Sequence, residues 1–151
     1  MTTVEQLLMQ ARQRSPGAYA GAVTPQEAFE LLQLNPRVKL VDVRTNAERD
    51  WVGKVALPPD QHHAVQWSTW PGGVPNPDFV QQLDSVADKD DVLLFLCRSG
   101  VRSRHAAALA TEHGYANSFD ILEGFEGDKD GDGHRKTVGG WCHAGLPWLG
   151  A

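Results

Sequence analysis

The chain has 151 residues, of which 41% are hydrophobic and 22% are charged, and its formal net charge is -5. This length fits one compact domain that can bury a core without disulfides or metal ions. The acidic balance argues against a nucleic-acid partner, so any anion site must be local, built from a few arginines and backbone amides.

The first part of the chain predicts two helices. Apolar residues at helical spacing indicate a helix over residues 4–14, with a capping box that begins at Thr2 or at Thr3. Thr24, followed by a proline and then by a glutamate three positions on, is typical of the start of a second helix. This helix is expected to end at Asn35-Pro36.

A strand and an irregular segment follow. Residues 38–43 form an apolar run that predicts a buried strand. Residues 46–51 fit one or two helical turns, and residues 55–57 are a candidate for a short strand. Residues 60–77 are rich in Pro, Gly, His and Trp without a clear period. They are interpreted mostly as loop.

The second half of the chain alternates in the same way. Residues 77–86 predict a helix. Residues 92–96 form the most apolar run of the chain, typical of a strand buried on both faces in a parallel sheet. Residues 101–113 predict a helix that ends at Gly114, and residues 118–122 are a further strand candidate.

Strands therefore alternate with helices along the chain, which predicts an α/β protein with a largely parallel sheet. Residues 1–151 are interpreted as a single domain. Within it, residues 1–17 form an N-terminal helical extension and residues 126–138 a Gly/Asp-rich insert.

Two cysteines, Cys97 and Cys142, are too few for a disulfide scaffold and lack the spacing of a zinc site. Their different neighbourhoods predict two free thiols in a reducing compartment, with a disulfide between them as the alternative. No run approaches the roughly 18 apolar residues of a membrane helix, and the polar N-terminus is unlike a signal peptide. We expect a cytoplasmic protein with no membrane partner, no metal and no cofactor.

The residues that carry chemistry lie between the most apolar strand and the helix after it. Cys97 stands at this junction, with Arg98 and Arg102 close by. Ligands of open α/β sheets bind beyond the carboxyl ends of strands, where a helix N-terminus offers unpaired N–H groups and partial positive charge. These features stabilise a thiolate over a thiol, and Gly100 lets the loop curl so that its amides point inward. The pattern predicts a cysteine nucleophile in an anion cradle, without an obvious general base. The structural alternative is a buried cysteine that merely ends a strand.

This loop resembles the active-site loop of rhodanese-like sulfurtransferases, in which a cysteine is followed by a basic residue, a glycine and an arginine. Further segments resemble the other motifs of that family in the same order, and the resemblance extends over residues 18–149. These segments are Leu40-Val41-Asp42-Val43-Arg44 with Glu48, Gly114-Tyr115, Leu122-Glu123-Gly124-Phe125, Gly139-Gly140-Trp141 and Gly145-Leu146-Pro147-Trp148.

The resemblance implies a single three-layer α/β domain with a parallel sheet of about five strands and helices on both faces. It also implies sulfur transfer in two steps. The Cys97 thiolate takes the sulfane sulfur of a small anionic donor such as thiosulfate, and a thiol, cyanide or a protein acceptor then takes it from the persulfide. The residues expected to bind the substrate are Arg98, Ser99, Gly100, Val101, Arg102 and Ser103. Asp42 and Arg44 could support the loop or form a structural ion pair.

Two alternatives belong to other functional classes. Cysteine phosphatases of the related fold place five residues between the cysteine and the arginine, whereas four separate Cys97 from Arg102 here, and Leu96 takes the place of the histidine found in many of them. The shorter loop encloses less volume, which suits a sulfur atom better than a phosphate. Non-catalytic rhodanese-like modules commonly lack the cysteine, so its presence favours an enzyme, although a sulfur-relay role stays open.

Two further motifs carry weaker hypotheses. Residues 128–133 match the opening of a calcium-binding EF-hand loop, but its twelfth position is Gly139, where a bidentate glutamate is required. A turn-rich insert is the favoured interpretation. Cys142 could resolve a persulfide on Cys97 or serve as a structural residue, and the second is favoured because no spacing brings the two together.

Overall fold

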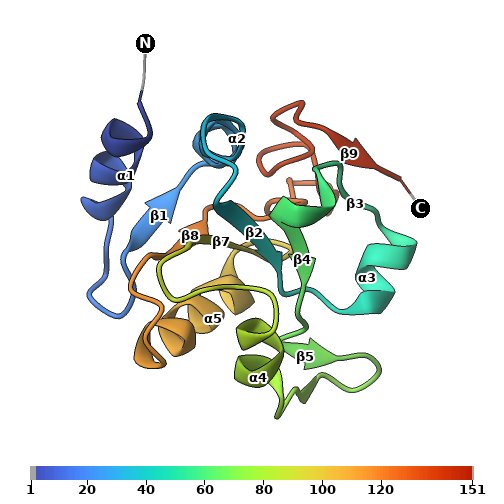
Figure 1. Ribbon diagram of the computed structural model, residues 1–151. Coiled ribbons are helices and arrows are strands. Elements are labelled where there is room, and N and C mark those ends of the chain that lie inside the picture. The colour runs from blue at the N-terminus through green and yellow to red at the C-terminus, as the bar shows by residue number, and fades with distance from the viewer. Residues whose placement is uncertain (1–2, 151) are drawn as a thin grey trace.

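The computed structural model describes residues 3–150, and its centre is a parallel sheet of five strands (Figure 1). Every neighbouring pair in the sheet is parallel. In spatial order the strands are β1 (Gly21–Val23), β8 (Ser118–Ile121), β7 (Val92–Leu96), β2 (Val38–Asp42) and β4 (His62–Ala64).

Helices cover both faces of this sheet. α1 (Val4–Arg12) and α2 (Pro25–Leu34) pack on one face, and α4 (Phe79–Asp84) and α5 (Val101–Glu112) pack on the other (Figure 1). The short α3 (Asn46–Trp51) follows β2. The predicted three-layer α/β fold with a parallel sheet of about five strands is confirmed.

The central strand β7 divides the core into two clusters. Leu94 and Leu96 point toward α1 and α2, whereas Leu93 and Phe95 point toward α4 and α5. All four side chains are fully buried. Successive residues of a strand face opposite sides of the sheet, so a continuous apolar run is what a strand between two helical layers requires.

Helix ends follow the capping signals of the sequence. Thr3 and Thr24 each accept a hydrogen bond at the start of α1 and α2 in a complete capping box. The alternative box at Thr2 lies outside the described residues. α1 ends at Arg12, two residues earlier than expected, because the Arg14 amide bonds to the carbonyl three residues back and tightens the last turn.

Residues 60–77 were expected to be mostly loop, and this expectation is wrong in one important part. Strand β4 lies within the segment and completes the sheet at its edge beside β2. Its sequence is His62-His63-Ala64, which lacks the apolar residues that mark a strand. Pairing with β2 and the preceding Gln61 determine its position, because the buried Gln61 amide donates to the carbonyls of Leu32, Asn35 and Val38.

Several shorter elements complete the chain. A 3-10 turn, η1 (Pro59–Gln61), precedes β4, and β5 (Ser68–Thr69) pairs with β6 (Val74–Pro75) as a small hairpin. The strand expected at residues 55–57 is β3 (Lys54–Val55), which pairs with β9 (Trp148–Leu149) outside the main sheet. β1 was not expected, because three residues leave too short a pattern to recognise.

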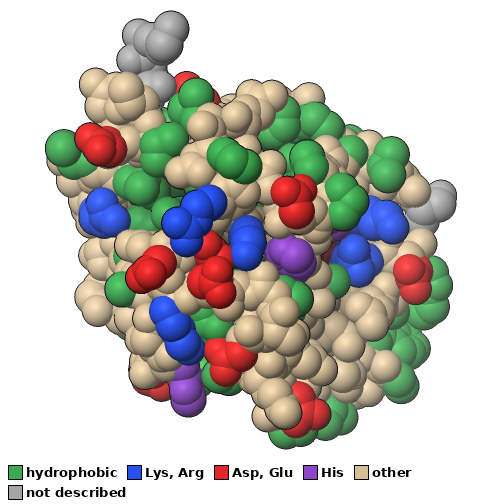
Figure 2. Space-filling model, in the orientation of Figure 1, with side chains coloured by type: hydrophobic (Ala, Val, Ile, Leu, Met, Phe, Trp, Pro, Cys, Tyr) green, Lys and Arg blue, Asp and Glu red, His purple; other side chains and the backbone are tan. Residues whose placement is uncertain are grey.

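Charged side chains of both signs are interspersed on the face drawn in Figure 2, and the described residues of that face form no broad basic area. This distribution agrees with an anion site that is local rather than spread over the surface. Within residues 3–150, no helix is both long enough and apolar enough to cross a bilayer.

Candidate active site

Cys97 lies at the carboxyl end of β7, immediately before the turn that leads into α5. Only 2% of the residue is exposed. Gly100 is the N-cap of α5 and has a φ of 112°, in the left-handed region that favours glycine. This turn brings the start of a helix of 12 residues back over the sulfur. The expected junction of buried strand, cysteine and helix N-terminus is therefore present.

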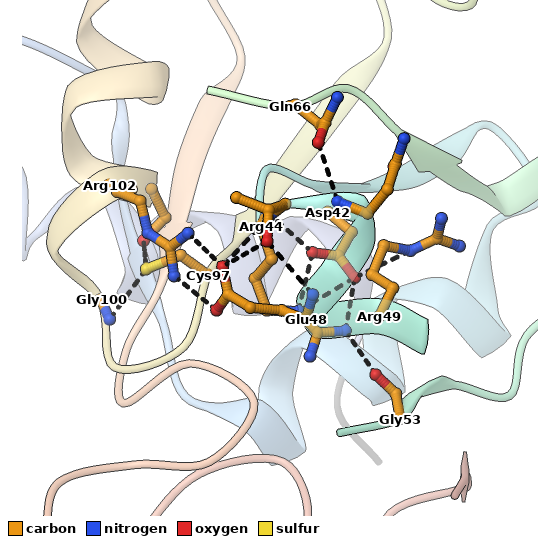
Figure 3. A network of polar contacts seen from close by, with 12 residues as sticks. Asp42, Arg44, Glu48, Arg49, Gly53, Gln66, Cys97, Gly100 and Arg102 are labelled. Carbon is orange, nitrogen blue, oxygen red and sulfur yellow. Dashed lines mark hydrogen bonds and ion pairs between the residues drawn. The ribbon is translucent and has the colours of Figure 1, made fainter. Parts of the chain in front are cut away.

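Two polar groups contact the Cys97 sulfur. The Gly100 amide donates to Sγ at 3.0 Å, and Sγ lies 3.3 Å from the Ser103 hydroxyl, one turn into α5 (Figure 3). A backbone N–H aimed at sulfur at the positive end of a helix stabilises a negative charge there. The arrangement can hold a thiolate or a persulfide.

A later segment of the chain fixes the shape of the loop. The amides of Phe125 and Glu126 donate to the carbonyls of Cys97 and Arg98 at 2.8 and 3.0 Å, and the Gly127 amide also donates to Arg98. A Cβ at the preceding Gly124 would lie 2.5 Å from the Cys97 carbonyl oxygen. The glycine allows this close approach, so the expected motif at residues 122–125 packs directly against the loop that follows Cys97.

Arg102 is held by Glu48 in a bidentate ion pair. Its two terminal nitrogens lie 2.6 and 2.9 Å from the Glu48 carboxylate (Figure 3). Glu48 also closes the capping box of α3 with Thr45. Burial opposes ionisation of Glu48, but the hydrogen bonds and charge of Arg102, together with Thr45, lower the pKa of Glu48 to about 2. Arg102 is thus positioned by α3 rather than left to swing freely.

Arg98 and Arg102 line one side of a pocket of about 370 Å³. Arg98 is exposed, whereas Arg102 is half-buried. Residues of β5 and of the turn between β5 and β6, including Trp70, line the same pocket. Two guanidinium groups beside a polar cavity suit an anionic ligand. The other wall residues are Thr45, Glu48, Ser68, Thr69 and Gly73.

Asp42 and Arg44 form a fully buried ion pair at the end of β2, with a shortest distance of 2.7 Å (Figure 3). Arg44 also donates to the Gly53 carbonyl, and its guanidinium lies over the Phe125 ring at 4.2 Å. Arg49 adds a longer contact of 3.5 Å to Asp42. The pair therefore reaches the loop indirectly, through Phe125, and its contacts are those of a structural ion pair.

A family model described as a rhodanese-like domain matches residues 24–130. The chain belongs to the rhodanese-like domain family.

Relatives of this rhodanese-like protein cover more than four fifths of its length. An uncharacterized protein of Rickettsia conorii is 38% identical over 124 residues, which are 81% of this chain and 91% of the relative. The thiosulfate sulfurtransferase GlpE of Haemophilus influenzae is 30% identical over 125 residues, 83% of this chain and 90% of the relative. The crystal structure of Rv0390 from M. tuberculosis is 42% identical, with a TM-score of 0.80 over 87% of this chain and 98% of that one. Sulfur transfer is therefore an activity found in this family.

The structure adds two residues that sequence reasoning did not place at the site. Glu48 was noted as part of a motif, but its ion pair with Arg102 was not foreseen. Asp120, on β8, accepts a short hydrogen bond from the buried Ser103 hydroxyl and is itself 1% exposed. Burial raises the pKa of Asp120 to about 7, against smaller lowering effects of Ser103 and Arg104. An aspartate between the apolar residues Phe119 and Ile121 of the expected strand was the available signal.

Three other expected loop residues line a second pocket. Ser99, Gly100 and Val101 line a separate pocket of about 430 Å³ together with Asp120. Residues of the Cys97 loop thus line two separate pockets, one that contains Arg98 and Arg102 and one that contains Asp120.

Both cysteines are free thiols, as expected. Cys142 is half-buried against the core cluster beneath α1 and α2. Burial raises the pKa of Cys142 to about 11, so this thiol stays protonated at neutral pH. A protonated thiol is a poor nucleophile, which favours a structural role.

The Gly/Asp-rich insert is a closed turn. Both carboxylate oxygens of Asp130 accept hydrogen bonds from within the insert, from the amides of Asp132 and His134 and from the Thr137 hydroxyl. Among the residues that the structure describes, no three acidic, histidine or cysteine side chains converge as they would around a metal ion. The turn-rich interpretation of this segment accounts for its contacts.

Proposed function

We propose that this rhodanese-like protein is a sulfurtransferase that carries sulfane sulfur as a persulfide on Cys97. The observation that carries the proposal is the position of Sγ, 3.0 Å from the Gly100 amide at the N-terminus of α5. An attacking sulfur must be an anion, and the persulfide formed is also an anion. A preorganised N–H donor at the positive end of a helix stabilises both.

The proposed reaction has two displacements at sulfur. The Cys97 thiolate attacks the sulfane sulfur of a small anionic donor, a new S–S bond forms, and the donor's S–S bond breaks. With thiosulfate, sulfite leaves with the bonding electron pair. A thiol, cyanide or a protein acceptor then attacks the terminal sulfur and releases the Cys97 thiolate. The relationship to GlpE supports thiosulfate as the donor to test first.

The two loop arginines have distinct proposed roles. Arg98 is exposed on the wall of the 370 Å³ pocket and would meet the negative charge of the donor first. Arg102 is fixed by Glu48 and would place its positive charge at a constant position on the pocket wall, without gripping the donor through its terminal nitrogens. The amides and side chains from Ser99 to Ser103 complete the proposed substrate-binding loop.

Cysteine phosphatase activity is the second candidate. A phosphatase loop uses its arginine to grip the phosphoryl group, but both terminal nitrogens of Arg102 are engaged by Glu48. The four residues between Cys97 and Arg102 also enclose a small volume. Both observations favour sulfur over phosphate.

Intact mass spectrometry tests the proposal directly. Purified protein is measured before thiosulfate, after thiosulfate and after added cyanide. The expected result is a gain of one sulfur atom, mapped to the peptide with Cys97, which cyanide removes. The Cys97→Ser variant should gain nothing, whereas the matched Cys142→Ser control should behave as the unmodified chain.

Two results would contradict the proposal. The first is no gain of sulfur while Cys97 still reacts with a small alkylating reagent, which would favour the non-catalytic module. The second is hydrolysis of a phosphate ester that depends on Cys97, which would favour the phosphatase.

A further inference from the structure

Cys97, Ser103 and Asp120 form a line of three buried polar side chains behind the loop. Sγ lies 3.3 Å from the Ser103 hydroxyl, which donates a short hydrogen bond to Oδ1 of Asp120. No more than 2% of any of the three residues is exposed. Bulk water therefore screens them little, and the charge on one end depends strongly on the proton at the other.

The Ser103 hydroxyl has one proton and two neighbours that can use it. When Asp120 is a carboxylate, the hydroxyl donates to it and turns its lone pairs toward the sulfur, which suits a protonated thiol. When Asp120 is protonated, it donates to Ser103 Oγ, and the hydroxyl proton can point at the sulfur. This second arrangement gives a thiolate or a persulfide a donor in addition to the Gly100 amide.

We propose that Cys97 and Asp120 share one proton through Ser103, so that negative charge on the sulfur and negative charge on Asp120 exclude each other. The thiol proton passes to Ser103 Oγ as the hydroxyl proton passes to Oδ1 of Asp120. One S–H bond breaks, one O–H bond forms on the carboxyl group, and the serine keeps one proton. The charge moves from carboxylate to sulfur without a co-reactant. Asp120 is then a positioning residue, and this role rests on the proposed function of Cys97.

The surroundings of Asp120 set the pH at which the exchange occurs. Arg104 of α5 attracts its negative charge, and Glu123 and Asp128 line the same pocket. Burial and then the negative charge of Asp120 raise the pKa of Tyr19, which precedes β1. The paired residues on β1 and β7 are apolar. Because burial is the largest effect and raises the pKa of Asp120 to about 7, the exchange falls near neutral pH.

The pKa of Asp120 determines how pH changes the amount of Cys97 thiolate. Below about pH 7 Asp120 is protonated and does not oppose a negative charge on the sulfur. Above about pH 7, each further pH unit lowers the protonated fraction of Asp120 by about the same factor as it would raise the thiolate fraction of Cys97. The thiolate population therefore levels off instead of rising about tenfold per pH unit.

The rate of Cys97 alkylation by iodoacetamide reports the thiolate without any sulfur donor. It is measured from about pH 5.5 to about pH 9 in a Cys142→Ser background, so that one thiol remains. With Asp120 intact, we expect the rate to reach a plateau above about pH 7. In the Asp120→Asn variant, the amide that replaces the carboxyl donates to Ser103 at every pH, so the alkylation rate should show no plateau. The variant should then react about tenfold faster than the unsubstituted chain at pH 8, and at the same rate below about pH 6.

Two variants separate the proton link from simple charge effects. Asp128→Asn removes an exposed carboxylate from the same pocket but leaves the hydrogen bonds between Cys97, Ser103 and Asp120 in place, so it should keep the plateau. Ser103→Ala removes the hydroxyl that links the two groups. The alkylation rate of Cys97 should then rise with pH without a plateau, and at low pH it should be lower than in the unsubstituted chain. Melting temperatures of all variants establish that each is folded.

The proposal is overturned if Asp120→Asn follows the profile of the unsubstituted chain, or if the plateau survives in Ser103→Ala. Should Asp120→Asn fail to fold, the Asp120 carboxyl is titrated by carbon NMR before and after Cys97 is blocked as a methyl disulfide. Its titration should shift when the thiol is blocked, and an unchanged titration overturns the proposal. Failure of persulfide formation in the mass experiment would leave these alkylation results intact, so the two ideas are tested separately.

Discussion

Two carboxylates flank the sulfur-bearing loop, both almost fully buried, in opposite surroundings. Asp42 faces the guanidinium of Arg44 at 2.7 Å, with Arg49 at 3.5 Å. Asp120 faces a serine hydroxyl, and burial raises its pKa to about 7. A buried carboxylate that is paired with a cation keeps its charge and acts as structure, whereas one that is paired with a neutral hydroxyl can gain or lose a proton near neutral pH. The first fits a structural role, and the second fits the proton exchange proposed above.

The largest expected effect is on stability, at the paired carboxylate. Arg44→Met should lower the free energy of unfolding by about 3 kcal/mol, because it leaves the buried Asp42 with only the longer contact to Arg49. Denaturant unfolding at neutral pH measures this loss. The double variant Asp42→Asn with Arg44→Met should recover part of it, and a loss below about 1 kcal/mol for the single variant would show that water reaches Asp42.

At Asp120 we expect the opposite effect, because substitution of this residue should raise the free energy of unfolding. Its folded-state pKa lies above the value of about 4 in the unfolded chain, so stability falls as the pH rises from about 4 to about 7. Asp120→Asn removes this fall and should stabilise the protein by about 3 kcal/mol at pH 8, but little at pH 4. The free energy of unfolding at the two pH values measures this, with Asp128→Asn as the control. Destabilisation at pH 8 would contradict the comparison.

Glu48 is the intermediate case, half-buried and paired with Arg102. Its pKa of about 2 is below the unfolded value of 4.5, so its stabilising effect is present above about pH 4.5 and is lost as the pH falls toward 2. Glu48→Gln should cost about 1 to 2 kcal/mol at pH 7, less than the pKa alone implies because solvent screens the pair. The cost should shrink at about pH 3. A constant cost would mean that lost packing, rather than charge, causes it.

Sequence reasoning succeeded where the pattern was contiguous. The apolar strand, Cys97 and the helix after it are adjacent in the chain, so periodicity and helix-end chemistry predicted both β7 with α5 and the loop between them. Strand β4 was missed because its histidines carry no apolar signal, and its place depends on hydrogen bonds to distant carbonyls. Asp120 was missed for a related reason. It meets Ser103 through the register of β7 and β8, which pairs it with Phe95, and no local motif encodes that register.

The hydrogen bonds from residues 125–127 to the carbonyls of Cys97 and Arg98 have a consequence for biosynthesis. During translation Cys97 is added to the chain before residues 125–127, which shape its loop. A growing chain therefore exposes an ordinary thiol, and the anion-stabilising geometry arises when the later segment docks. Premature termination before residue 125 would leave a polypeptide that contains Cys97 but lacks the amides that shape its loop.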